Sequence, residues 1–223
     1  MKTRPILFSG PMVRALLAGE KTQTRRIIKS QPYSNGYHFD GQEILCHNDY
    51  LPPSAMLMDV KFGNYIDTIS NLEGWESLCP YGQPGDRLYV RETWNFNKNA
   101  IGSAREEDGP FEYAADGHKS QTIDDRWWPS IHMPRYASRI MLEITKVRIE
   151  QLHDITDDDA YDEGVQTWAA EVQENGNKFS SIRSAWQALW EGINGVESWK
   201  SNPWVWVVEF KRVTPPAPGT EGE

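Results

Sequence analysis

The sequence predicts an α+β fold that is mostly β, an antiparallel β-barrel with a few flanking helices and two loop-rich insertions. The first observation is a set of three β-prone runs, 87–94, 139–149 and 204–212. The second is that the stretches of helical period between them are short, as at 182–191, where apolar residues form one stripe. Together these patterns favour a barrel with flanking helices.

Two long stretches interrupt these elements. Residues 30–80 are rich in Pro, Gly, Asn, Asp and Tyr, with a candidate strand near 44–45, and residues 95–130 are polar, Gly-rich and acidic. Neither holds a sustained period, so we interpret both as loop-rich insertions. A chain of 223 residues that is 39% apolar can bury a core. We expect one domain over 1–213 and a disordered tail over 214–223.

The chain begins with a predicted strand over 4–9, followed by a helix. Pro11 suits the first turn of a helix, and the apolar residues after it repeat at helical spacing to about Ala18. Gly19 fits the position just past a helix end, where the left-handed conformation costs glycine little. The helix should therefore stop at Gly19.

A segment with three cations and two hydroxyls follows at 21–26, Lys-Thr-Gln-Thr-Arg-Arg. Residues 1–30 hold seven Lys and Arg against the single acid Glu20, although the chain has a net charge of -9. That charge argues against a protein that coats nucleic acid nonspecifically, and the local excess favours a pocket for one nucleotide. The segment suits an anionic or carbonyl-bearing ligand; the alternative is the ordinary basic end of a helix.

An acidic residue lies on the apolar side of a predicted strand. The turn at 83–86 launches the run 87–94, where alternation places Glu92 and Trp94 on one face and Arg91 on the other. An unpaired buried charge is very costly. Glu92 is therefore either paired with an arginine or part of the functional site.

Two later stretches add candidates. His132 and Arg135 lead into a predicted strand over 139–150 and are either ordinary surface residues or ligand contacts beside aromatics. Further on, Thr156 is a good N-cap and Gly164 ends a short helix. This leaves Glu163 at the negative end of that helix, where it either points to water or pairs with a cation such as Lys21.

Composition limits cofactors and location. The only cysteines are Cys46 and Cys79, so a disulfide scaffold is excluded, and a zinc site would need His47 and a distant fourth ligand. We expect two reduced thiols, no metal and no cofactor. The N-terminus lacks the pattern of a signal peptide, and no apolar run approaches membrane-spanning length, which predicts a cytoplasmic protein with no membrane partner.

The spacing Gly19-x-Lys21-x-x-x-x-Arg26, with Leu-Ala before it and Thr24 inside it, resembles the signature of the ASCH domain, a PUA-like β-barrel family. About half of the chain shares the resemblance, over 5–29, 84–94, 155–165 and 202–213. The strand Arg-Glu-Thr-Trp and the closing Trp-x-Val-x-Glu-Phe are similar to the longer ASCH-domain proteins of tailed phages and prophages. The resemblance implies a PUA-like barrel.

The resemblance also implies a chemistry. Small bacterial members of the family include amidohydrolases that remove the acetyl group of N4-acetylcytidine with a Lys, a Thr and a Glu. By motif these residues match Lys21, Thr24 and Glu163. A Lys with a lowered pKa can accept the Thr proton, the Thr can attack the amide carbonyl, and the Glu can protonate the leaving amine.

Lys21 and Thr24 would face opposite ways in a straight strand, so this mechanism requires a turn after Gly19. The insertions at 30–80 and 95–130 are absent from the small enzymes. Other members of the family bind RNA or are ribonucleases, so the alternative function is a noncatalytic module that binds RNA or single-stranded nucleic acid, or a ribonuclease.

We therefore expect a nucleoside-processing hydrolase whose partner is a small nucleoside or nucleotide, or RNA. The predicted catalytic residues Lys21, Thr24 and Glu163 should share one cleft with Glu92 and one or more Trp. The predicted substrate-binding residues are Arg26, Glu92, Arg91, Arg135 and Trp94.

Overall fold

The computed structural model describes residues 1–29, 31, 33–39, 42–46, 78–96, 110–117, 126–174 and 178–214. Its strands are β1 (Thr3–Leu7), β2 (Gln23–Ile27), β3 (Tyr33–Phe39), β4 (Gln42–Cys46), β5 (Arg87–Arg91), β6 (Trp94–Phe96), β7 (Phe111–Tyr113), β8 (Met141–Gln151) and β9 (Trp204–Val213). The α-helices are α1 (Gly10–Ala18), α3 (Asp157–Asp162), α4 (Val165–Glu174), α5 (Ile182–Asn194) and α6 (Val196–Lys200). Short 3-10 helices are η4 (Ala114–Asp116), η5 (Ser130–His132), η6 (Arg135–Ala137) and η7 (Leu152–Asp154).

The main sheet has the strand order β1-β5-β8-β9-β2. Four of these strands pair antiparallel, but β1 runs parallel to β5, so the sheet is mixed. No backbone hydrogen bond between described residues joins its two edge strands, β1 and β2, and the sheet is not closed. Instead, the guanidinium of Arg26 on β2 donates to the carbonyl of Leu7 on β1 at 2.6 Å. The prediction of an α+β fold with mostly antiparallel pairing is confirmed, and the parallel pair of β1 and β5 was not predicted.

Asp86 explains the parallel pair. Its carboxylate accepts hydrogen bonds from the backbone N–H of Lys2 at 2.6 Å and from Arg4 at 2.9 Å, just before β5 begins. Both strands therefore start at the same point and run the same way. A sequence pattern describes one strand at a time, so it contains no information about this contact.

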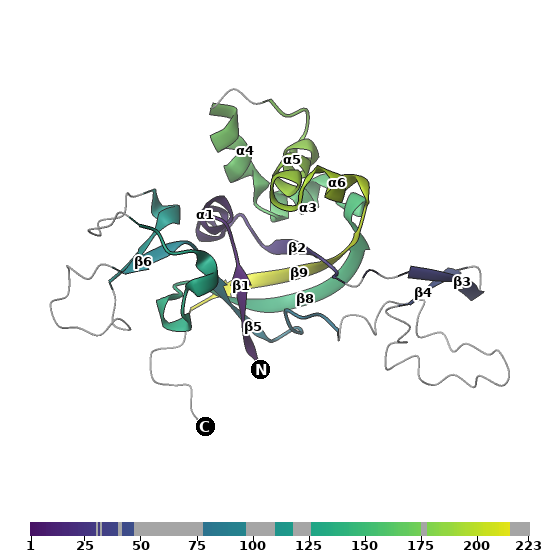
Figure 1. Ribbon diagram of the computed structural model, residues 1–223, viewed down its shortest axis with the longest axis horizontal. Helices are drawn as coiled ribbons and strands as arrows, with labels where there is room; N and C mark the ends of the chain where they lie inside the picture. The colour runs from purple at the N-terminus through teal and green to yellow at the C-terminus, as the bar shows by residue number, and fades with distance from the viewer. Residues whose placement is uncertain are drawn as a thin grey trace.

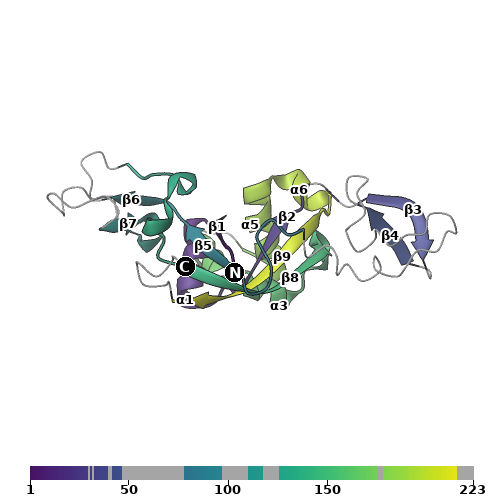
Figure 2. The same cartoon turned by 90° about the horizontal axis from the view of Figure 1, so that it is seen from below.

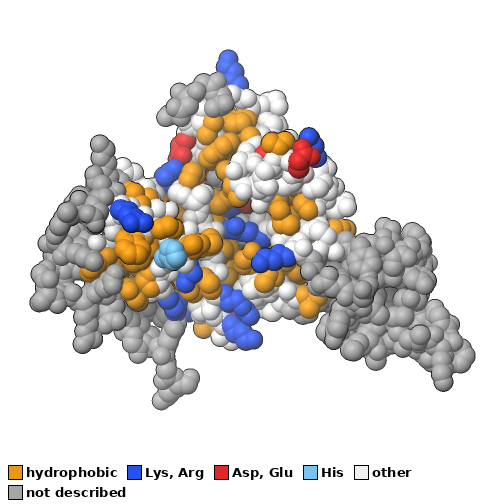
Figure 3. All heavy atoms as spheres, in the orientation of Figure 1, with side chains coloured by type: hydrophobic (Ala, Val, Ile, Leu, Met, Phe, Trp, Pro, Cys, Tyr) orange, Lys and Arg blue, Asp and Glu red, His pale blue; other side chains and the backbone are white. Residues whose placement is uncertain are grey.

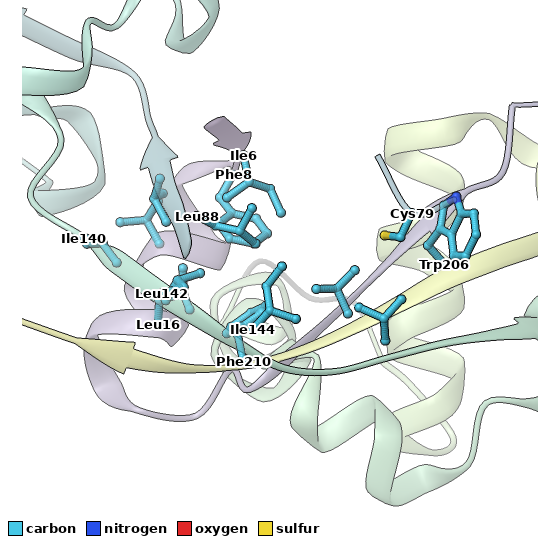
Figure 4. Close-up of a cluster of buried hydrophobic side chains, with 14 of the residues drawn as sticks. Ile6, Phe8, Leu16, Cys79, Leu88, Ile140, Leu142, Ile144, Trp206 and Phe210 are labelled. Carbon is cyan, nitrogen blue, oxygen red and sulfur yellow. The ribbon is translucent and has the colours of Figure 1, made fainter. Parts of the chain in front are cut away.

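Strand β9 is buried on both faces. Trp206, Val208 and Phe210 face a core that β1, α1, β5 and β8 share (Figure 4). Val205 and Val207 face the opposite way, into a second core beneath α3, α4 and α5. This double burial explains the almost continuous apolar sequence of the strand. In Figure 1 the helices α3 to α6 lie together on one side of β9 and β2.

Two predicted short helices are confirmed, and one predicted strand is shorter than expected. The helix that ends at Gly19 and the short helix capped by Thr156 are present, and Gly19 and Gly164 adopt φ values of 78° and 72°. The run 87–94 is not one strand: β5 ends at Arg91, where Phe8 donates its N–H to the Arg91 carbonyl and Glu92 donates to the sulfur of Met133. Residues 94–96 form β6 instead.

The insertions are partly ordered where they are described. In 30–80 the strands β3 and β4 form a two-stranded antiparallel sheet, and in 95–130 β7 pairs with β6 (Figure 2). Most of both stretches lies outside the described residues, as does the predicted tail beyond Thr214. The predicted strand near 44–45 is present as β4, whereas its partner β3 and the pair of β6 and β7 were not predicted. Within the described part of the chain, no helix is both long enough and apolar enough to cross a bilayer.

The contact of Asp86 with β1 predicts a pH effect on stability. Hydrogen bonds from the Lys2 backbone and Arg4 lower the pKa of Asp86 to about 2. The folded-state pKa lies below the ordinary value of 3.8, so this stabilisation is present above about pH 4 and is lost as pH falls towards 2. In urea unfolding, Asp86→Asn should lower the free energy of unfolding at pH 7, and the difference from wild type should shrink between pH 4 and pH 2. A difference that stays constant over this range would contradict the assignment.

Candidate active site

The site is organised by an ion pair between Lys21 and Glu163. The Lys21 ammonium lies 2.9 Å from a carboxylate oxygen of Glu163 and 2.8 Å from the backbone carbonyl of the same residue. The two side chains are 0% and 4% exposed. The backbones of the two residues also form an isolated antiparallel bridge. Of the two alternatives for Glu163, the structure therefore has the pair with Lys21, not the side chain in water.

Two glycines bring these residues together. Gly19 ends α1 in the left-handed conformation, and the chain then folds back so that Lys21 donates its N–H to the Ala15 carbonyl at 3.2 Å. Gly164 follows Glu163 with φ of 72°, and a Cβ there would lie 2.7 Å from the Ala15 Cβ and 2.8 Å from the Lys21 Cβ. Only glycine fits this close approach of α3 to α1.

A wider charge network surrounds the pair. The Arg25 guanidinium lies 3.4 Å from Glu163, 2.9 Å from Glu150 and 3.2 Å from Asp159. Arg148 lies 3.0 Å from Asp159 and also contacts Glu150. Burial opposes the charge of Arg25, but the three carboxylates outweigh it and raise the pKa of Arg25. Arg25 therefore remains a fixed positive charge beside Glu163.

Lys21 is affected differently. Burial is the largest influence and lowers the pKa of Lys21, Glu163 opposes this shift, and the charges of Arg26 and Arg25 add to it. The ring of Phe8 lies 5.4 Å from the ammonium and supplies an apolar neighbour. An amine in this setting gives up its proton more readily than an exposed lysine, which is the property of a general base.

Thr24 lines a small recess beside the ion pair. We call it the Thr24 recess; it has a volume of about 50 Å³. Its lining combines polar residues of β2 with Glu163 and apolar side chains of α1 and α5: Met12, Thr24, Arg25, Arg26, Ile27, Glu163, Trp186, Leu189, Trp190, Ile193 and Asn194. The recess thus contains the predicted nucleophile, the predicted acid and two tryptophans.

A second, larger cavity shares Arg26 with this recess. We call it the Arg26 cavity; it has a volume of about 240 Å³ and lies between the edge strands β1 and β2. Its described lining is Pro5, Ile6, Leu7, Arg26, Tyr81, Arg91 and Ile131. Arg91 donates to the Ile131 carbonyl at 3.2 Å and to the Tyr89 hydroxyl at 3.3 Å.

The remaining predicted residues lie apart from the recess. Glu92 accepts two hydrogen bonds from Arg139, at 2.9 and 3.0 Å, so the first of its two alternatives is the one present. Trp94 is buried against Phe111 and Trp128. The expected cleft does include tryptophans, Trp186 and Trp190, but neither Glu92 nor Trp94 lines it. Both of these residues lie beyond the end of β5, where the chain leaves the main sheet.

Arg135 stacks on the Tyr89 ring at 5.5 Å, near Arg91 rather than Lys21. His132 ends η5 beside Ile131. Neither lines the Thr24 recess.

Three residues of the site were not predicted from the sequence: Trp186, Trp190 and the acid Glu150. The two tryptophans lie on the apolar stripe of α5, where a core role and a recess role have the same pattern. Glu150 could have been predicted, because Arg148 and Glu150 share one face of a strand whose other face is apolar.

Comparison of the chain with protein-family models, curated proteins and solved structures finds no match. Among the described residues, no group of three or more His, Cys, Asp or Glu side chains is arranged to hold a metal ion.

Gly164 provides a test of how the site is assembled. Gly164→Ala should destabilise the protein by about 2–4 kcal/mol, because the left-handed φ and the overlap with Ala15 and Lys21 both cost free energy. Gly117→Ala is the control: its φ is 78° and nothing lies within 4 Å of the added Cβ, so about 1–2 kcal/mol is expected. Chemical denaturation measures both variants, and equal losses would show that the approach of α3 to α1 is not tight.

Proposed function

We propose that the protein is a hydrolase that removes the acyl group from an N4-acylated pyrimidine nucleoside. The observation that carries the proposal is the buried Lys21 with a lowered pKa, held 2.9 Å from Glu163, beside a recess that Thr24 and Glu163 both line. A base, a hydroxyl nucleophile and an acid are the groups that amide cleavage by acyl transfer requires.

In the proposed reaction, one proton first moves within the pair from the Lys21 ammonium to the Glu163 carboxylate. Neutral Lys21 then takes the proton of the Thr24 hydroxyl, and the Thr24 oxygen attacks the amide carbonyl carbon. Both hydrogen bonds that the Lys21 nitrogen makes with described side chains and backbone go to Glu163, which orients the amine. The guanidiniums of Arg25 and Arg26 line the same recess and would stabilise the developing oxyanion. The C–N bond then breaks as the protonated Glu163 gives its proton to the leaving N4 amine, and the acyl group stays on the Thr24 oxygen. Water attacks this ester and gives a proton to Glu163 while Lys21 returns its proton to the Thr24 oxygen, so that the carboxylic acid leaves and the three residues are restored.

A proposal about the fold accompanies the proposal about function. We infer a PUA-like barrel, with β1 and β2 as the neighbouring edges. The resemblance of the segment 19–26 to the ASCH signature supports this inference. So does the Arg26 side chain, which bridges the two edges to the Leu7 carbonyl.

A noncatalytic RNA-binding module, or a ribonuclease, is the second candidate. The observation that favours it is a set of exposed rings near cations: Trp128 and Tyr136 are each 50% exposed, and Arg135 and Arg91 lie over the Tyr89 ring. Exposed aromatics beside arginines are suited to stacking bases. In that case Lys21 would contribute to stability and affinity but not to turnover.

The hydroxyl of Thr24 is the group to remove first. Thr24→Val keeps the shape of the side chain, and release of cytidine from N4-acetylcytidine, measured by chromatography, should fall by at least about 10²-fold. Thr22→Val is the matched control: this exposed threonine two residues away should tolerate the change with unaltered turnover. Lys21→Ala should also abolish turnover. If wild type releases no cytidine while wild type and Lys21→Ala both bind a short RNA, the hydrolase proposal fails.

The pH profile tests the role of Lys21. Because a general base must be neutral, kcat/KM should rise with pH through the pKa of Lys21, and that rise should lie below the ordinary lysine value of 10.5. Stopped assays of wild type between pH 5 and pH 10 measure it. A rate that falls as pH increases through this range would contradict the assignment of Lys21 as the base.

A further inference from the structure

We propose that the Arg26 cavity is a binding site for a phosphate group, and that the hydrolase acts on a nucleotide, with the phosphate held in the Arg26 cavity while the N4-acyl group enters the Thr24 recess. The phosphate site is inferred from the residues of the cavity alone. The statement about the substrate rests on the proposed function.

The described lining of the cavity is positively charged. Two of its lining residues, Arg26 and Arg91, carry guanidiniums, and none of the described lining residues is acidic. In Figure 3, Lys and Arg side chains gather across the middle of the face drawn, with hydrophobic side chains between them. In a chain of net charge -9, such a local excess is a feature that attracts an anion.

The two arginines of the cavity donate their hydrogen bonds to neutral acceptors. Arg26 donates to the Leu7 carbonyl, and Arg91 donates to the Ile131 carbonyl and the Tyr89 hydroxyl, all of them neutral acceptors. Among the described residues neither arginine forms an ion pair, and the buried Nε atoms of both have no hydrogen-bond partner. No described carboxylate in the cavity neutralises these two guanidiniums, and a bound phosphate would supply the missing counter-charge.

Comparison with two other arginines sharpens this step. Arg25 and Arg87 also have a buried Nε without a partner. Arg25, however, is surrounded by three carboxylates, and Arg87 lies at the start of β5 outside the cavity lining. Of these four arginines, Arg26 and Arg91 are the two that line the Arg26 cavity, so they are the pair that one anion bound there could contact together.

Tyr81 adds a neutral donor. Burial raises the pKa of the Tyr81 phenol, so its O–H stays protonated and able to donate a hydrogen bond in the cavity. Two guanidiniums and a phenol form a set of donors without an acceptor carboxylate, which suits the oxygens of a phosphate.

Size connects the phosphate site to the substrate. The Arg26 cavity, at about 240 Å³, is several times larger than the Thr24 recess, at about 50 Å³. The recess alone is therefore too small for a nucleoside. Because Arg26 lines both spaces, a phosphate in the cavity would lie next to a group that enters the recess.

Binding measurements test the phosphate site directly. Calorimetric titrations would use cytidine, cytidine 5′- and 3′-monophosphate, and inorganic phosphate as a probe of the anion alone. At least one nucleotide should bind wild type about tenfold or more tightly than cytidine, because of the new charge-assisted hydrogen bonds. Arg91→Gln should remove this preference and weaken the binding of inorganic phosphate. Tyr81→Phe should reduce the preference in part.

Arg87→Gln is the matched control, since it removes one positive charge from the same strand outside the cavity. It should keep the preference. Equal affinities for cytidine and both nucleotides, or equal losses in Arg91→Gln and Arg87→Gln, would overturn the phosphate site.

Turnover of N4-acetylcytidine and its 5′- and 3′-phosphates separates the two proposals. If wild type hydrolyses none of them yet prefers a nucleotide through Arg91, the hydrolase proposal fails and the phosphate site stands. If wild type hydrolyses nucleoside and nucleotides with equal kcat/KM and shows no phosphate preference, the phosphate site fails and the hydrolase proposal stands. A kcat/KM that is higher for one phosphate and falls to the nucleoside value in Arg91→Gln supports both.

Discussion

The rest of the structure depends on the burial of two opposite charges, Lys21 and Glu163. A charge taken out of water is tolerated only with a partner and with its remaining hydrogen bonds made. Both requirements are met by residues far apart in the chain, and the ends of α1 and α3 must therefore meet. The geometry of the candidate site follows from this requirement, because β2 continues directly from Lys21 and carries Thr24, Arg25 and Arg26 into place.

Local features of the structure were predictable from the sequence. Gly19, Thr156 and Gly164 mark helix ends through backbone conformation and capping, and these effects operate over a few residues. The apolar run of β9 predicted a central strand because double burial leaves a direct trace in composition. The basic segment at 21–26 could be selected as a candidate site because a local excess of charge can also be seen directly in the sequence.

Contacts between distant segments were not predictable in this way. Glu92 had two alternatives until the structure showed Arg139 beside it. Glu163 likewise had two alternatives, water or a cation such as Lys21, until the structure showed the pair. The early end of β5 depends on Ser138, which donates to the Val90 carbonyl, and on Met133. Such contacts form only when the whole chain has folded.

The position of β2 in the sheet also has a consequence for biosynthesis. Within the described sheet β2 has one strand neighbour, β9, which is the last strand of the chain, and Thr24 pairs with Val208. A ribosome that has made Lys21 and Thr24 but has not yet reached 204–213 has not produced β9, the strand with which β2 pairs. Lys21 and Thr24 are therefore synthesised well before the strand that holds β2 in place.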